Sequence, residues 1–182
     1  SFMIRQDWLD ALGLSAPTTT DELMETMKAF QENDVNQSGE ADEVLSISLS
    51  DFSSGLSNFY GIGRTMSGEL TYVNTETGTV ESPWYHENIQ SYIEFVKSLV
   101  DAGYVDTSDQ LDEKKAENKI AGLFDWAGET WQEVGITVPE GAAAAYYAPV
   151  VLKASNAAVE TEPYLCWQQG YQLGGNKYAV TL

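Results

Sequence analysis

The densest cluster of potential metal ligands in the sequence is the ten-residue stretch DVNQSGEADE, from Asp34 to Glu43. Calcium takes roughly six to eight oxygen ligands, and a short loop can supply them when oxygen-bearing residues alternate around a tight glycine turn. Gly39 would make that turn, and the expected ligands are Asp34, Asn36, Ser38, the main-chain carbonyl of Glu40, Asp42 and Glu43. The stretch therefore predicts a structural calcium site.

The same residues also suit an acidic helix-to-strand turn, in which Asx side chains bond to the local backbone. The stretch departs from an EF-hand because Leu45 stands where the closing Glu would be, so Asp42 and Glu43 must close the site. Repulsion among three converging carboxylates favours a bound cation over the bare turn. Magnesium is disfavoured by its rigid octahedral geometry. No open coordination position is evident, so we expect a structural role for the ion.

Composition excludes several classes of function. The 182 residues include 9 basic and 28 acidic side chains, for a formal net charge of -19, so nucleic acid is not an expected partner. Cys166 is the single cysteine and is expected to be a buried, inert thiol. His86 is the single histidine, which excludes a multi-imidazole metal site. No apolar run is long enough for a membrane span and no signal peptide is evident.

Periodicity and capping signals place the acidic stretch between a helix and a strand. The clearest helix spans residues 20–32, where Thr19 and Glu22 predict a capping box. A shorter helix precedes it and ends at Gly13, with an apolar stripe of Trp8, Leu9, Leu12 and Leu14. After the stretch, serines alternate with Leu45, Ile47 and Leu49, as in a strand with one buried face.

Further elements follow along the chain. Pro83 is expected to open a long helix that ends at Gly103 and buries Ile89, Ile93, Val96, Leu99 and Val100. A helical turn is expected within 52–63, a charged helix within 111–119, a helix from 125 to 135, and strands at 70–73, 79–81, 120–124 and 147–152. The alternation of helices and strands predicts an α/β domain with a helix-covered mixed sheet.

One long run carries a family resemblance: IRQDWLDALGLSAPTTTDELMETMKAFQENDVNQSGEADEVLSISLS resembles a stretch of the family 1 extracellular solute-binding proteins of ABC transporters. It is most similar to the lipoprotein and alginate-binding branch. In that branch the loop binds calcium, so the resemblance implies the same six ligands. Two departures stand out, because Val35 replaces the usual proline and Ser38 replaces a longer Asn or Asp.

The resemblance continues more loosely through SGELTYVN, YHENIQSYIEFVKSLVDAGYVDTS and ENKIAGLFDWAGETW. Complete members of the family have two α/β lobes with a cleft between them, a type II periplasmic-binding-protein-like fold. The resemblance implies that residues 1–182 are one domain, most of the second lobe, without the first lobe, the lipid-anchor cysteine or the closing helices. Residues 1–3 are interpreted as a cloning remnant before native sequence that begins in mid-helix.

The resemblance implies a non-enzymatic function in carbohydrate transport. The intact protein would capture a sugar or oligosaccharide and deliver it to ABC permease subunits. It would be extracellular, either periplasmic or a lipoprotein that touches the membrane only through its missing anchor. The first candidate sugar-binding residues are Asp125 and Trp126, which follow the strand IAGLF. The others are Asp51, Phe52, Trp84 and Tyr85. Structural roles remain open, with Asp125 as a helix cap and Trp126 or Trp131 in the core.

Two other classes of function stay open on the residues alone. A calcium-dependent carbohydrate- or protein-interaction module would use the acidic loop to organise a surface, although a second copy of the loop is lacking. A glycoside hydrolase fragment would pair Asp125 with Glu129 beside tryptophans. In so acidic a chain such carboxylate pairs arise by chance, so the hydrolase is the weaker alternative.

Overall fold

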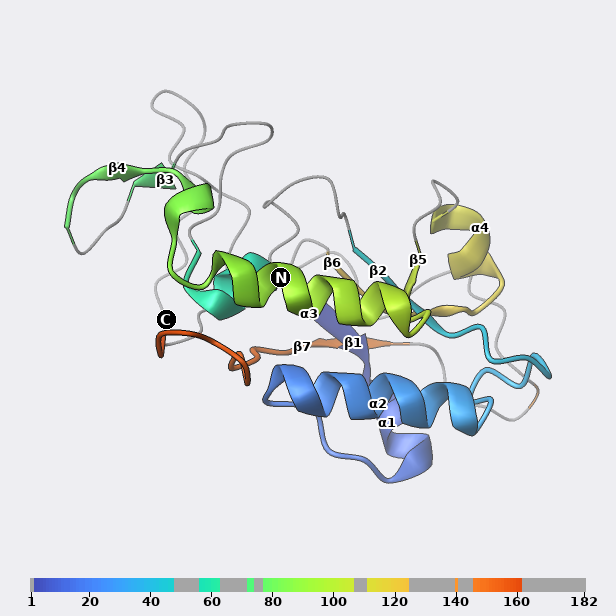
Figure 1. Cartoon of the computed structure of the whole chain (residues 1–182). Helices are drawn as coiled ribbons and strands as arrows, with labels where there is room; N and C mark the ends of the chain where they lie inside the picture. The colour runs from blue at the N-terminus through green and yellow to red at the C-terminus, as the bar shows by residue number, and fades with distance from the viewer. Residues whose placement is uncertain are drawn as a thin grey trace, which may run out of the picture.

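The structure is a computed structural model that describes residues 2–47, 56–62, 72–73, 77–106, 111–124, 140 and 146–161. Figure 1 shows helices over a central sheet, with a small hairpin to one side. The elements in chain order are β1 (Phe2–Arg5), α1 (Gln6–Leu12), α2 (Thr20–Glu32), β2 (Val44–Ser46), η2 (Leu56–Tyr60), β3 (Tyr72–Val73), β4 (Val80–Glu81), η3 (Pro83–Tyr85), α3 (Ile89–Asp101), β5 (Val105–Asp106), α4 (Leu111–Ala116), β6 (Ile120–Phe124) and β7 (Tyr147–Pro149).

The main sheet has five strands in the order β5-β2-β6-β1-β7. β2 runs parallel to both β5 and β6, whereas β1 runs antiparallel to β6 and β7. The predicted mixed α/β sheet is therefore confirmed. A separate two-stranded sheet pairs β3 with β4, and the turn between them includes Gly78 at φ +71°.

The chain begins in a strand, so the expectation that it begins in mid-helix is wrong. Phe2 and Met3 are 2 % and 4 % exposed in β1 and pair with Phe124 and Leu123 of β6. Two of the three residues interpreted as a cloning remnant therefore contribute to the core. A four-residue strand shows too little alternation to be distinguished from the helix that follows it directly.

The two faces of the sheet bury different clusters. Phe2, Ile4 and Leu45 pack with residues of α2 and α3 in the larger cluster, while Met3 and Leu123 belong to a smaller one. α2 and α3 lie side by side, and the Ser98 hydroxyl contacts the Met24 sulfur at 3.8 Å (Figure 1). These helices cover the same face of the sheet.

α2 confirms the predicted helix, with a capping arrangement shifted by one residue. The Thr19 side chain accepts a hydrogen bond from the Glu22 N–H at 3.1 Å, as expected for an N-cap. The Glu22 carboxylate bonds instead to the Thr18 N–H and hydroxyl, at 2.6 and 2.7 Å. These bonds to Thr18 lower the pKa of Glu22.

α3 differs from its prediction in both its start and its buried face. Pro83 opens only the 3-10 turn η3, and α3 begins at Ile89, after the fully buried Asn88 side chain binds the main chain of Tyr60 and Val159. The buried residues are Ser91, Tyr92, Phe95 and Leu99, whereas Ile93 and Val100 are 48 % and 40 % exposed. Two aromatic side chains fill the core and thereby set the rotation of the helix.

The remaining predicted elements are in part confirmed, in part different in length from the prediction, and in part outside the described residues. The stop at Gly13, the helical turn η2, the charged helix α4 and the strand β6 are confirmed. β7 ends at Pro149, Leu14 is exposed beyond the end of α1, and the two-residue β5 was missed. Leu49, Cys166, Trp131 and the helix expected from 125 to 135 lie outside the described residues. None of the helices in the described part of the chain is both long and apolar enough to cross a bilayer.

A buried ion pair joins the N-terminal strand to distant parts of the chain. Arg5, 1 % exposed, donates to both oxygens of Asp7 at 2.6 and 2.7 Å and to the Asn118 side-chain oxygen at 2.7 Å. Its guanidinium also stacks 4.2 Å from the centre of the Trp8 ring. Asp7 in turn accepts a hydrogen bond from the Tyr146 N–H at 3.1 Å, beside β7.

Substitution of Arg5 by Met tests this network. Arg5→Met leaves the Asp7 carboxylate buried without its charge partner, so the free energy of unfolding should fall by about 3 to 5 kcal/mol. Urea denaturation measures this loss. Lys97→Met is the matched control, because it breaks an exposed ion pair with Asp101 and should change stability far less. Equal losses of unfolding free energy in the two variants would show that breaking the buried ion pair costs no more than breaking an exposed one.

Candidate metal centre

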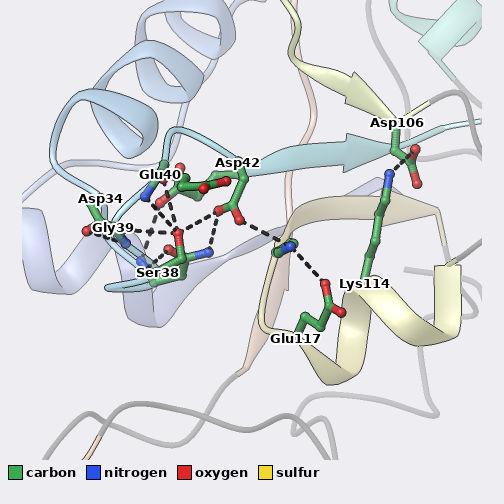
Figure 2. A network of polar contacts seen from close by, with 11 residues as sticks. Asp34, Ser38, Gly39, Glu40, Asp42, Asp106, Lys114 and Glu117 are labelled. Carbon is green, nitrogen blue, oxygen red and sulfur yellow. Dashed lines mark hydrogen bonds and ion pairs between the residues drawn. The ribbon is translucent and has the colours of Figure 1, made fainter.

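The acidic loop lies between α2 and β2 and is bent back on itself by three left-handed residues. Asp34, Gln37 and Gly39 have φ values of +45°, +59° and +86°. The loop opens where the Asn33 side chain bonds to the Ala29 carbonyl at 2.7 Å at the end of α2. Figure 2 shows the result, with Asp34, Ser38, Glu40 and Asp42 turned toward one another.

The Ser38 hydroxyl marks the point on which the loop oxygens converge. Its oxygen lies 3.0 Å from Asp42 Oδ1, 3.1 Å from the Glu40 carbonyl oxygen and 3.5 Å from Asp34 Oδ1. A serine hydroxyl carries one proton, so it can satisfy only one of these three acceptors. The centre of the loop therefore holds more oxygen lone pairs than hydrogen-bond donors, which is the environment that a hard cation prefers.

Backbone and amide donors satisfy other oxygens around this centre. The Gly39 N–H donates to Asp34 Oδ2 at 3.0 Å, and the Ser38 N–H donates to the Asn36 side-chain oxygen at 3.1 Å. The Asn36 amide donates to Asp42 Oδ1 at 2.8 Å. These are the local bonds that a bare Asx-rich turn would also make, so they do not distinguish a turn from a cation site.

The side chain of Glu43 does distinguish a cation site from a bare turn. It is 0 % exposed, and its Oε1 accepts a long hydrogen bond, 3.4 Å, from the Asn36 N–H. Its Oε2 is buried and has no hydrogen-bond partner among the described residues. Burial above all, with the charges of Asp42 and Asp34, raises the pKa of Glu43. A buried carboxylate oxygen that lacks a donor, in a loop that carries other negative charges, costs stability unless a cation compensates it.

The residues present therefore fit a hard divalent cation. Among the described residues there is no group of three or more His, Cys, Asp and Glu side chains arranged as metal ligands. The converging oxygens here are of mixed type, since they include a hydroxyl and a main-chain carbonyl beside the carboxylates. Mixed oxygen donors are typical of calcium rather than of zinc or other transition metals.

Two residues that sequence reasoning missed complete the electrostatics of the loop. The Lys119 ammonium nitrogen lies 3.3 Å from Asp42 Oδ2 and 2.8 Å from Glu117 Oε2, two carboxylates that Figure 2 labels. The hydrogen bond to Glu117, and after it the one to Asp42, raises the pKa of Lys119. A signal existed, because Lys119 directly precedes a strand that is parallel to the strand after the loop, and neighbouring parallel strands begin at the same edge.

The candidate sugar ligands lie elsewhere or outside the described residues. Trp84 and Tyr85 belong to η3, far from the acidic loop in Figure 1, and are 51 % and 90 % exposed. Asp51, Phe52, Asp125 and Trp126 fall outside the described residues. The strands that precede these two pairs in the chain, β2 and β6, are parallel neighbours.

Comparison with known proteins finds partial relatives. No family model matches the chain. It is 32 % identical over 109 residues to the fructooligosaccharide ABC transporter substrate-binding protein FusA of Streptococcus pneumoniae, covering 57 % of this chain and 19 % of FusA. It is 30 % identical over 130 residues to the polygalacturonan/rhamnogalacturonan-binding protein YtcQ of Bacillus subtilis, covering 67 % of this chain and 25 % of YtcQ. The chain thus spans a quarter or less of these relatives.

Solved structures agree with these relatives. S. pneumoniae FusA in complex with kestose matches with a TM-score of 0.63 and 27 % identity, over 85 % of this chain and 31 % of FusA. An EF-hand mutant of FusA in complex with fructo-nystose matches with a TM-score of 0.62 and 26 % identity, over the same shares. All of them are named as binding proteins. In sequence and in fold, this chain matches part of the solute-binding proteins of carbohydrate ABC transporters.

Proposed function

We propose that the chain is most of one lobe of a solute-binding protein that captures a sugar or oligosaccharide for an ABC transporter. Its relatives are named for fructooligosaccharides and for polygalacturonan and rhamnogalacturonan, so the substrate class is a carbohydrate. The intact protein would work outside the cytoplasmic membrane, periplasmic or lipid-anchored, and would pass its cargo to permease subunits. In this role the acidic loop is structural.

We assign a calcium ion to that loop, held by Asp34, Asn36, Ser38, the Glu40 carbonyl, Asp42 and Glu43. Two observations carry this assignment: the buried Glu43 oxygen that has no hydrogen-bond partner among the described residues, and the excess of acceptors around Ser38 in the same loop. An EF-hand in the relative FusA supports it. The ion, when bound, would supply charge compensation and fix the angle between α2 and β2.

The sugar would bind at the opposite edge of the sheet from the calcium loop. Asp51 and Phe52 follow β2, and Asp125 and Trp126 follow β6, so both pairs come after the carboxyl ends of parallel neighbours. Ligand crevices of α/β sheets lie at that edge. Trp84 and Tyr85 would contribute exposed aromatic faces for the C–H side of a sugar ring.

Calcium should stabilise the chain measurably. Metal-free protein prepared with EDTA should gain Tm on addition of calcium, because an ion that binds only the folded state adds about 2.7 kcal/mol at a hundredfold excess over its Kd. Differential scanning calorimetry measures the gain. If EDTA fails to lower Tm and calcium fails to restore it, the loop is only a turn.

Glu43→Gln should be more stable than the wild type in EDTA but should be stabilised less by calcium. In EDTA the variant should be more stable by about 1 kcal/mol, because a neutral amide replaces a buried carboxylate that lacks a donor. In calcium it should gain less than the wild type, because an anionic ligand is lost. Glu40→Gln is the control, since Glu40 contributes its main-chain carbonyl and its side chain is exposed. A destabilised Glu43→Gln variant in EDTA would refute the account of this oxygen.

Trp126→Ala in the intact protein should abolish carbohydrate binding with little change in Tm. Isothermal titration with kestose and with oligogalacturonides measures binding, and Tyr85→Ala, at an exposed site, should reduce it less. Residues 1–182 alone should bind the same glycan far more weakly, because a ligand normally buries most of its surface between two lobes. A large loss of Tm with binding retained would place Trp126 in the core instead.

A further inference from the structure

The acidic loop carries its own counter-ion. Among the described residues, the ion pair that reaches the loop comes from Lys119, whose ammonium lies 3.3 Å from Asp42 Oδ2. Asp42 Oδ1, the other oxygen of the same carboxylate, faces the Ser38 hydroxyl at the point of convergence. The Asp42 carboxylate therefore lies between a fixed positive charge on one side and the proposed cation position on the other.

The position of Lys119 is set by main-chain contacts on both sides. Its carbonyl accepts a hydrogen bond from the Val44 N–H at 2.9 Å, next to the end of the loop. Its own N–H donates to the Lys114 carbonyl at 2.9 Å. The preceding residue, Asn118, is 3 % exposed and bonded to Arg5. Lys119 thus starts from a rigid backbone, and its partly buried side chain reaches Asp42 from a fixed origin.

A fixed ammonium at this place has two opposite effects on the loop. Without a metal it offsets part of the repulsion among Asp34, Asp42 and Glu43. With a divalent cation bound it repels that cation and draws electron density on Asp42 away from it, which lowers affinity. Both effects act through the same carboxylate, so they cannot be separated by a change elsewhere in the loop.

We propose that Lys119 is a built-in counter-ion that holds the acidic loop together without metal and sets its calcium affinity by competing for Asp42. This inference rests on the proposed calcium site. It makes Lys119 a positioning residue rather than a ligand. A loop balanced in this way would respond to calcium at higher concentrations than its number of carboxylates suggests, and would stay folded below them.

Calorimetric calcium titration of the 182-residue chain, wild type against Lys119→Met, tests the proposal. The methionine keeps the apolar stem and removes the charge. The variant should bind calcium roughly five- to thirtyfold more tightly and should have a lower Tm in EDTA. Raising the ionic strength should narrow the gap in affinity, because salt screens the repulsion. Lys119→Gln, measured in parallel, guards against a folding defect specific to methionine.

Two matched variants separate local from general charge effects. Lys97→Met removes one positive charge from a distant exposed ion pair and should leave the calcium affinity within about twofold of the wild type. Lys119→Arg keeps the charge and should also bind like the wild type. Tighter binding in Lys97→Met equal to that in Lys119→Met would overturn the specific role of Lys119.

The outcomes distinguish this inference from the calcium assignment itself. Calcium binding by wild type and Lys119→Met with equal affinity would overturn the counter-ion and leave the calcium site standing. No binding by either would overturn both. Binding by Lys119→Met that the wild type lacks would support the counter-ion, since the ammonium would then outcompete the metal.

Discussion

Arg5 carries a charge into the interior, and three separate segments of the chain are arranged around it. Its bonds to Asp7 and Asn118 join β1 and α1 to the turn before β6, and its stacking on Trp8 covers the guanidinium. Such a pair adds little net stability compared with an apolar core, but separating its partners is costly. It therefore acts on geometry, because any shift of β1 or of the turn would leave a buried charge uncompensated.

That constraint passes from the core to the acidic loop. Asn118 is left-handed, at φ +61°, and its side chain is held by Arg5. Asparagine is among the few non-glycine residues that adopt this conformation readily. The next residue, Lys119, pairs with Asp42, and its carbonyl bonds to Val44. The buried arginine and the surface loop are thus parts of one chain of contacts, although Arg5 and Asp42 lie 37 positions apart in the sequence.

The features that the sequence predicts correctly are those that depend on residues close together in the chain. The helix α2, its N-cap at Thr19 and the ligand pattern of the loop depend on neighbouring residues, and the structure agrees with the first two. The face of α3 depends on which side chains fill the core, and Tyr92 and Phe95 outweigh the aliphatic stripe that includes Ile93. The strands β1 and β5 are too short to show a periodic pattern, so the sequence does not predict them. The contacts of Arg5 with Asn118 and of Lys119 with Asp42 join residues far apart in the chain, so a local sequence pattern cannot predict them either.

The proposed calcium site and the proposed sugar site lie at opposite ends of the same two strands. The loop enters β2 at its amino end, and β6 begins beside it at Lys119, so the metal position and its counter-ion share that edge. The candidate sugar ligands follow the carboxyl ends of the same two strands. A cation at the first edge cannot contact a ligand at the second, since the strands lie between them. In the proposed arrangement, an effect of the cation on the sugar would have to pass through β2, because the loop that would hold the ion leads directly into that strand.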